Sequence, residues 1–249
     1  MYSLCRSLFR LVKYAPKPVS HLLKTAKHRM LHKNWYAGNY MWFRREFGTW
    51  LIGRSDHLID ALLLDEPRTW NYVKKLVTGG EINSMLDIGA HIGGYCVVLG
   101  RKIPVVAIEP MPDTYMILNL NIKLNESDVE ALRAAAYDGS NPTVRLSRSP
   151  LHSGADAITQ DGTIEVRAYT VDELWKRFGP FDLIKIDVEG AETKVLRGLS
   201  ENPSYLVVEV RPNTIAYIIN SLKRKYRVLF LEKLLRAKGV WNVIFKSKN

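Results

Sequence analysis

Two short apolar runs joined by a glycine-containing turn constrain this chain more than any other feature. The first run, residues 85–88, leads into the turn Gly-Ala-His-Ile-Gly at 89–93, and the second run, residues 105–108, ends at Glu109. This order predicts a buried strand, a turn, a helix start and a second buried strand with an acid at its end. Such a layout builds a pocket for an adenosine-containing cofactor. Glycine lets backbone and ligand approach closely, and the carboxylate can accept hydrogen bonds from both ribose hydroxyls.

The composition of the turn argues against a dinucleotide. A dinucleotide fingerprint needs Gly-x-Gly-x-x-Gly, and the residue two positions after Gly89 is His91. A histidine side chain there would obstruct a pyrophosphate, whereas S-adenosylmethionine carries no phosphate. Asp87 could then act near the cationic methionine part of that cofactor. The alternative is a plain strand–turn–helix connection in which the glycines serve packing alone.

Five segments between Met85 and about Glu209 resemble, in order and spacing, the FkbM-type family of class I S-adenosylmethionine-dependent methyltransferases. They are LDIGAHIGGY, VVAIEPMPDTYMILNLNIKLN, AAAYD, FDLIKIDVEGAETKVLRGL and YLVVEV. Glu66-Pro67 could match a Glu-Pro that the family pattern has upstream of the first strand. The resemblance implies S-adenosyl-L-methionine as the cofactor and methyl transfer as the activity.

The alternation of strand and helix patterns from Met85 onward predicts an α/β fold with a parallel sheet and helices on both faces. The resemblance narrows this to the Rossmann-like class I methyltransferase fold, with a mostly parallel seven-stranded sheet whose last strand is antiparallel. Core strands are expected near 85–89, 104–108, 129–135, 182–187, 204–210, 226–231 and 240–245. Helices are expected near 93–101, 112–124, 170–178, 190–199 and 213–224. Two further runs, 143–147 and 164–168, predict an inserted hairpin with a loop beside the site.

Three segments make up the chain. We expect a basic amphipathic helical extension over residues 1–34, an aromatic-rich hairpin and a helix over 35–80, and the S-adenosylmethionine-binding methyltransferase domain over 81–249. The apolar and basic residues of 1–34 recur at helical spacing, which is typical of a helix lying on an anionic membrane surface. The same pattern fits a transit peptide, a helix packed on the domain, or an oligomer contact such as that of a homodimer.

The net charge of +11 is concentrated at the two ends of the chain. Residues 1–50 and 211–249 each hold ten Lys or Arg and one acid, so the middle of the chain is acidic. Basic ends can attract a membrane surface, nucleic acid or an acidic substrate, and they can equally be solvated helix faces. No apolar run approaches the ~20 residues that span a bilayer, and the two cysteines suggest neither a disulfide framework nor a metal site. We expect a cytoplasmic protein that is at most peripheral at a membrane.

Ligands of an open α/β sheet bind at the carboxyl ends of its strands. The residues that follow the strands are therefore the candidates for cofactor binding. They are Asp87, Gly89, Ala90, His91, Gly93, Glu109, Pro110, Tyr137, Asp138 and Asp187. The resemblance implies that Asp138, with Tyr137 beside it, contacts the adenine, and the alternative is a turn residue before Gly139.

The fourth strand of the predicted core leads into a cluster of acids. Asp187 and Glu189, the predicted catalytic residues, lie with Lys185 on one side of an extended chain. Two carboxylates so close should raise the pKa of one of them, which favours a general base, unless Lys185 neutralises them. Alternatively these acids, Glu192 above all, form the cap and first turn of a helix.

A loop histidine completes the catalytic candidates. His152 is the predicted histidine at the acceptor side, and Ser149 and Ser153 of the same loop are further candidates. His57 and His91 are weaker candidates for a base. Some O-methyltransferases hold a divalent ion with carboxylates, but no clear ligand set is evident, and we expect no metal.

The predicted function is O-methylation of a hydroxyl on a sugar, glycan or other metabolite, by in-line methyl transfer. This acceptor class is what the resemblance implies. The fourth-strand motif is not the Asn-Pro-Pro-Tyr type that grips the amino group of a flipped adenine. The runner-up is an RNA methyltransferase whose basic termini hold phosphates. A third alternative is a non-catalytic scaffold of the same fold.

Overall fold

The structure is a computed structural model. It describes residues 36–37, 40–54, 57, 66–148, 157–159, 161–234 and 239–248. The helical extension expected over residues 1–34 lies outside the described residues, and so do His152, Ser149 and Ser153 of the predicted acceptor loop.

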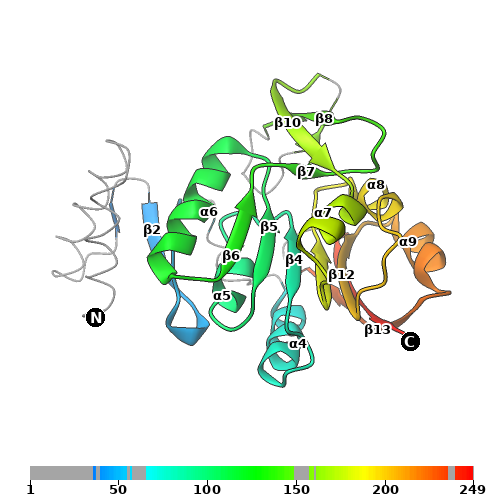
Figure 1. The fold of residues 1–249 in the computed structure, drawn as a ribbon, viewed down its shortest axis with the longest axis horizontal. Helices are drawn as coiled ribbons and strands as arrows, with labels where there is room; N and C mark the ends of the chain where they lie inside the picture. The colour runs from blue at the N-terminus through cyan, green and yellow to red at the C-terminus, as the bar shows by residue number, and fades with distance from the viewer. Residues whose placement is uncertain are drawn as a thin grey trace.

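A seven-stranded sheet forms the centre of the molecule (Figure 1). Its strands, in spatial order, are β13 (Tyr226–Lys233), β14 (Trp241–Ser247), β12 (Tyr205–Val210), β11 (Leu183–Ile186), β4 (Met85–Ile88), β5 (Val105–Ile108) and β6 (Val129–Leu132). Neighbours from β12 to β6 pair in parallel, whereas β14 runs antiparallel to both β12 and β13. The predicted seven-stranded sheet with an antiparallel last strand is therefore confirmed.

Helices cover both faces of this sheet, as predicted. Side chains alternate along each strand, so Met85 packs on one face while Leu86 packs on the other. The first face buries apolar residues of α4 (Pro67–Thr78), α5 (Cys96–Leu99) and α6 (Pro112–Asn125). The second face buries those of α7 (Val171–Phe178), α8 (Glu192–Arg197) and α9 (Ile215–Leu222). Because both faces are buried, the central strands are continuously apolar, which is the pattern visible in the sequence.

A small second sheet lies beside the main one. It contains the predicted inserted hairpin, whose two runs pair as antiparallel strands. Its strands are β7 (Ala135–Ala136), β10 (Ile164–Tyr169), β8 (Thr143–Ser147) and β9 (Ala157–Ile158), in that spatial order. The strand expected over 129–135 is in fact split, because the chain leaves the main sheet after Leu132 and Ala135 then pairs with Ala168 of β10. Figure 1 shows this sheet above one end of the main strands.

Two predicted helices begin later than expected because left-handed residues occupy their first positions. His91 (φ 51°) and Gly93 (φ 100°) precede α5, which starts at Cys96. Glu189 (φ 53°) and Gly190 (φ 107°) precede α8 in the same way. In both places the chain makes a turn at the carboxyl end of a strand before the helix starts, which brings backbone groups to that edge of the sheet.

The predicted aromatic-rich hairpin is present as β2 (Tyr40–Arg44) and β3 (Trp50–Arg54), with β1 (Tyr36–Ala37) at its edge and the short helix η1 (Glu46–Gly48) between the two long strands. Amide side chains of α6 attach it to the core. Asn121 is fully buried, accepts a hydrogen bond from Ile52 N (2.6 Å) and donates to Ile52 O (2.9 Å) and Ile92 O (2.8 Å). These bonds satisfy edge-strand groups that the hairpin itself leaves unpaired.

None of the described helices is both long and apolar enough to cross a membrane.

Asn121→Ala should destabilise the protein by about 2–4 kcal/mol, because it leaves buried backbone groups of Ile52 and Ile92 without partners. Urea unfolding followed by circular dichroism measures the loss. Asn119→Ala is the matched control on the same helix, since the bond of its amide among the described residues is to Tyr115 O at a partly buried position. Equal unfolding midpoints for the two variants would contradict this role of Asn121.

Candidate active site

The turn after β4 lies directly against the end of β11. Gly89 has a φ of 83°, and a Cβ built on it would lie 1.7 Å from the carbonyl oxygen of Asp187. No side chain fits in that space. Glycine at this position therefore lets the carboxyl ends of two neighbouring strands meet, and it brings Asp87 and Asp187 to one cavity.

Asp87 is a buried carboxylate with one oxygen unused. Its Oδ2 accepts a hydrogen bond from Cys96 N (3.1 Å), whereas its Oδ1 accepts none from the described residues. The side chain is 1% exposed, and this burial raises the pKa of Asp87. A carboxylate held in this way fits the cationic end of S-adenosylmethionine, because a nearby positive charge would offset the cost of burying it.

Glu109 is fixed by two backbone groups at the end of β5. Its Oε2 accepts a hydrogen bond from His91 N and its Oε1 accepts one from Met111 N, both at 2.9 Å. The left-handed conformation of His91 turns its N–H toward the carboxylate. Glu109 lines the cavity, and a carboxylate oxygen can accept more than one hydrogen bond, so this side chain suits two neighbouring hydroxyls of a ribose.

An apolar wall continues the cavity beyond Glu109. It is made by Met111, Ala134, Ala135, Ala136, Leu146 and Ile158. Leu146 and Ile158 come from the small second sheet, which therefore supplies one side of the pocket. Alanine and branched apolar side chains of this kind suit contact with an uncharged aromatic ring such as adenine.

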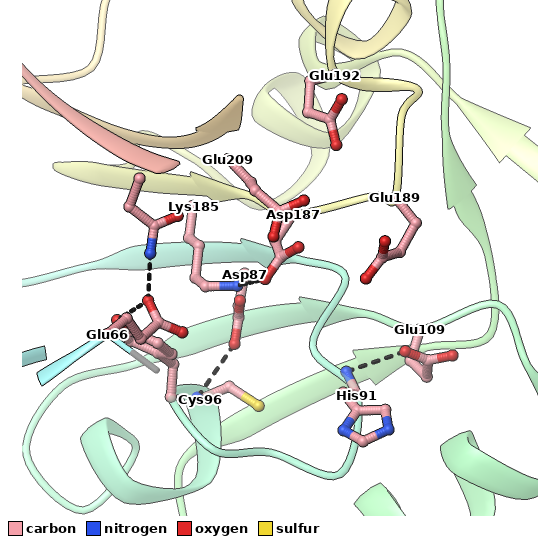
Figure 2. A network of polar contacts seen from close by, with 12 residues as sticks. Glu66, Asp87, His91, Cys96, Glu109, Lys185, Asp187, Glu189, Glu192 and Glu209 are labelled. Carbon is pink, nitrogen blue, oxygen red and sulfur yellow. Dashed lines mark hydrogen bonds and ion pairs between the residues drawn. The ribbon is translucent and has the colours of Figure 1, made fainter. Parts of the chain in front are cut away.

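The other end of the cavity is strongly charged (Figure 2). Lys185 donates to Asp187 Oδ2 at 2.8 Å, and its ammonium lies 5.2 Å from the centroid of the Tyr95 ring. Burial alone would lower the pKa of Lys185, but the carboxylates of Asp187 and Asp87 outweigh it and raise the pKa. Lys185 therefore stays charged.

The carboxylate with a raised pKa in this cluster is Glu209 of β12, which sequence reasoning did not single out. Burial, together with Asp187 and Glu189, raises the pKa of Glu209 far above its usual range. Burial acts on Asp187 in the same direction, but Lys185 outweighs it and lowers the pKa of Asp187. The sequence left two alternatives for Asp187 and Glu189: a raised pKa on one of them, or neutralisation by Lys185. At Asp187 the structure shows neutralisation by Lys185.

Arg211, which follows β12, binds several of these acids at once. Its Nη2 lies 2.7 Å from Glu189 Oε2 and 2.9 Å from Glu209 Oε1, and its Nη1 lies 3.2 Å from Glu192 Oε1. Glu192 also accepts from Gly190 N (2.9 Å) and begins α8, so its predicted place in the first helical turn is confirmed. Glu189 and Asp187 line the cavity, whereas Glu192 does not.

Glu66, immediately before α4, closes the charged end. Its Oε2 accepts from Tyr95 Oη (2.7 Å) and from Asn242 Nδ2 (2.5 Å), and the residue lines the cavity. The signal in the sequence was the Glu-Pro pair at 66–67, whose proline starts the helix. Tyr95 and Arg211 carried no comparable signal, because their positions depend on how distant strands are ordered.

Most of the predicted cofactor-binding residues meet in one cavity, namely Asp87, Gly89, Ala90, His91, Glu109, Pro110 and Asp187. Gly93 does not line the cavity. A Cβ at this position would lie 2.2 Å from the Val97 side chain, so the absence of a side chain lets the turn pack against α5. His57 is buried edge-on to the His91 ring, with the centroids 4.9 Å apart.

Tyr137 and Asp138 do not line the cavity. Asp138 accepts from Ser140 N and from Lys194 Nζ, both at 3.1 Å. The Ser140 hydrogen bond and the Lys194 ammonium lower the pKa of Asp138 to about 2. These contacts support Asp138 as a turn residue before Gly139. Its contact with the adenine remains a prediction.

Comparison with known proteins identifies the family. Residues 87–239, more than half of the chain, match the methyltransferase FkbM domain. The hexuronic acid methyltransferase AglP of Haloferax volcanii is 24% identical over 172 residues, which cover 65% of this chain and 72% of that protein. The methyltransferase sdnD of Sordaria araneosa is 27% identical over 165 residues, which cover 51% of this chain and 64% of that protein.

A solved structure shows the same fold. The tRNA (uracil-54, C5)-methyltransferase of Pyrococcus abyssi, crystallised with S-adenosyl-L-homocysteine, superposes with a TM-score of 0.51 at 16% identity. The superposition covers 85% of this chain and 45% of that one.

The domain match, together with this fold, defines the class of protein as a methyltransferase. The chain belongs to the FkbM methyltransferase family and is an S-adenosylmethionine-dependent methyltransferase.

Gly89→Ala should weaken the binding of S-adenosylhomocysteine at least about tenfold, or about 1.4 kcal/mol, because the new methyl group forces β4 and β11 apart. Isothermal titration calorimetry measures the affinity. Gly80→Ala is the matched control: its φ of 76° imposes a similar backbone cost, but nothing lies within 4 Å of the added Cβ. Unchanged affinity in Gly89→Ala would contradict the close-approach role.

Proposed function

We propose that this protein transfers a methyl group to a hydroxyl of a sugar, a glycan or a related metabolite. The observation that carries the proposal is that two carboxylates, Asp187 and Glu189, line the same cavity as Glu109 and the apolar wall. A hydroxyl acceptor loses a proton during transfer, and a carboxylate beside it can take that proton. The similarity to a hexuronic acid methyltransferase supports a sugar acceptor.

Different residues of the cavity would bind different parts of the cofactor. Glu109 would hold the ribose hydroxyls, the alanine wall the adenine, and Asp87 the cationic methionine end. When bound, S-adenosylmethionine supplies the reactive methyl group, and the chain supplies orientation and proximity. The backbone contact at Gly89 sets how close Asp87 and Asp187 lie to each other in the cavity.

The charge of the site favours a neutral acceptor atom. Asp87, Asp187 and Glu189 line the reacting end, with Lys185 as the cation among the described lining residues there. A carboxylate approaching this end would be repelled, whereas a hydroxyl can donate a hydrogen bond to Asp187 or Glu189. The proposed product is therefore a methyl ether and not a methyl ester.

Surface partners form a separate part of the proposal. We propose that residues 1–34 attach the enzyme to an anionic membrane surface, which suits a lipid-linked or membrane-bound glycan acceptor. Co-sedimentation with anionic vesicles, compared between the full chain and a chain lacking residues 1–34, tests this. Equal co-sedimentation of the two chains would overturn it.

Asp187→Asn should lower kcat for methyl transfer by about 100-fold or more, since it removes a carboxylate that would orient the acceptor hydroxyl and that pairs with Lys185. The assay follows radiolabelled methyl from S-adenosylmethionine into uronic-acid-containing and neutral oligosaccharides. Asp182→Asn, at the other end of the same strand, is the control, because its carboxylate only accepts a hydrogen bond from Asn83 N (2.7 Å). A product that mild alkali cleaves would be an ester and would sink the hydroxyl proposal.

A further inference from the structure

The aromatic-rich hairpin packs directly against the cofactor turn, which is the segment of residues 89–95 after β4. Gly53 of β3 makes the closest approach. A Cβ built on it would lie 2.9 Å from Ile92 Cδ1 and 3.0 Å from both His57 Nδ1 and Phe43 Cε2. The φ of Gly53 is not positive, so its backbone conformation does not require glycine. Glycine at this strand position therefore serves the close contact with the cofactor turn.

Hydrogen bonds to two carbonyl groups of the cofactor turn add to this contact. Arg45, 8% exposed at the end of β2, donates from Nη1 to Gly94 O at 3.4 Å. Asn121 donates to Ile52 O of β3 and to Ile92 O of the turn, and so links the two segments. The hairpin thus contacts the cofactor turn at several successive residues, one of which, Gly94, lines the cavity.

His57, three residues after β3, contacts the residue that holds Glu109. His57 is fully buried, and its ring meets the His91 ring edge-on, with the centroids 4.9 Å apart and the planes at 78°. His91 has a φ of 51°, which a residue with a side chain keeps only where its surroundings support it. In this conformation His91 N donates to Glu109 Oε2 (Figure 2). A chain of contacts therefore runs from His57 through His91 to Glu109.

These supporting residues come from outside the segment that defines the family. The match to the methyltransferase FkbM domain covers residues 87–239, whereas Gly53 and His57 precede it. Neither residue lines the cavity. An effect of either residue on cofactor binding would therefore pass through the cofactor turn.

We propose that Gly53 and His57 are positioning residues for the cofactor. They hold Ile92 and His91 so that the His91 N–H fixes the carboxylate of Glu109 toward the ribose. Because a hydrogen bond weakens steeply as its angle departs from linear, a small shift of the turn would release this carboxylate. The inference rests on the proposed place of Glu109 at the ribose hydroxyls, and it is independent of the methyl acceptor.

A double-mutant cycle on the full chain tests this role, with the affinity for S-adenosylhomocysteine measured by calorimetry. His57→Ala should weaken binding about fivefold or more in the wild-type chain, but less than about twofold in a chain that carries Glu109→Ala. Once the carboxylate is gone, its positioning no longer contributes. Gly53→Ala, which adds a methyl group against Ile92, should show the same dependence on Glu109.

Asn125→Ala is the matched control. Asn125 of α6 accepts a hydrogen bond from Trp50 N and donates one to Trp50 O, both at 2.8 Å, so it anchors the same hairpin away from the cofactor turn. The substitution should lower the urea midpoint and leave the affinity for S-adenosylhomocysteine within about twofold of wild type. Circular dichroism confirms that each variant is folded.

Two results would overturn the inference. The first is wild-type affinity in folded His57→Ala and Gly53→Ala, and the second is an equal loss of affinity with and without Glu109→Ala. Wild-type affinity in Glu109→Ala alone would remove the ribose assignment as well. A loss in Glu109→Ala with none in the other two variants would remove only the positioning role. Since no acceptor is present, these results do not bear on O-methylation.

Discussion

The close approach of Gly89 to the backbone of Asp187 is the contact on which the site depends. It joins the ends of β4 and β11, so the residues following two neighbouring strands share one cavity. From this contact follow the position of Asp87 at the charged end and the turn through His91, whose N–H holds Glu109. Because the central strands are parallel, their carboxyl ends lie at one edge of the sheet. Because Gly89 has no side chain, the turn after β4 can contact the backbone of Asp187 at the end of β11.

Opposing electrostatic demands then divide the cavity. The apolar wall from the small second sheet favours a flat uncharged ring, while the opposite end gathers carboxylates around Lys185 and Arg211. Burial raises the pKa of Glu209 and of Asp87, and the buried ammonium lowers that of Asp187. A site so rich in negative charge is suited to a sulfonium and to a hydroxyl donor, and poorly suited to an anionic reacting atom.

Local sequence patterns predicted the strands of the sheet and the acid after β5, because buried parallel strands are continuous apolar runs and ligands bind at their carboxyl ends. They did not predict the cluster around Arg211. Glu209 sits within an apolar strand, and its contact with Asp187 exists only because β12 pairs with β11. Spacing of acids along the chain says little about acids that meet on adjacent strands. Nor did local patterns reveal that the chain leaves the main sheet after Leu132, which brings Ala134, Ala135 and Ala136 to the cavity.

Calorimetric titration with S-adenosylmethionine, S-adenosylhomocysteine and NADH, for the wild-type chain and for Glu109→Ala, tests the central claim most directly. Glu109 accepts hydrogen bonds from two backbone N–H groups at 2.9 Å, which hold its carboxylate at the cavity. The account predicts micromolar binding of both sulfur compounds, weakened at least tenfold by the substitution, and no binding of NADH. Binding of NADH, or affinities for the sulfur compounds that Glu109→Ala leaves unchanged, would contradict it.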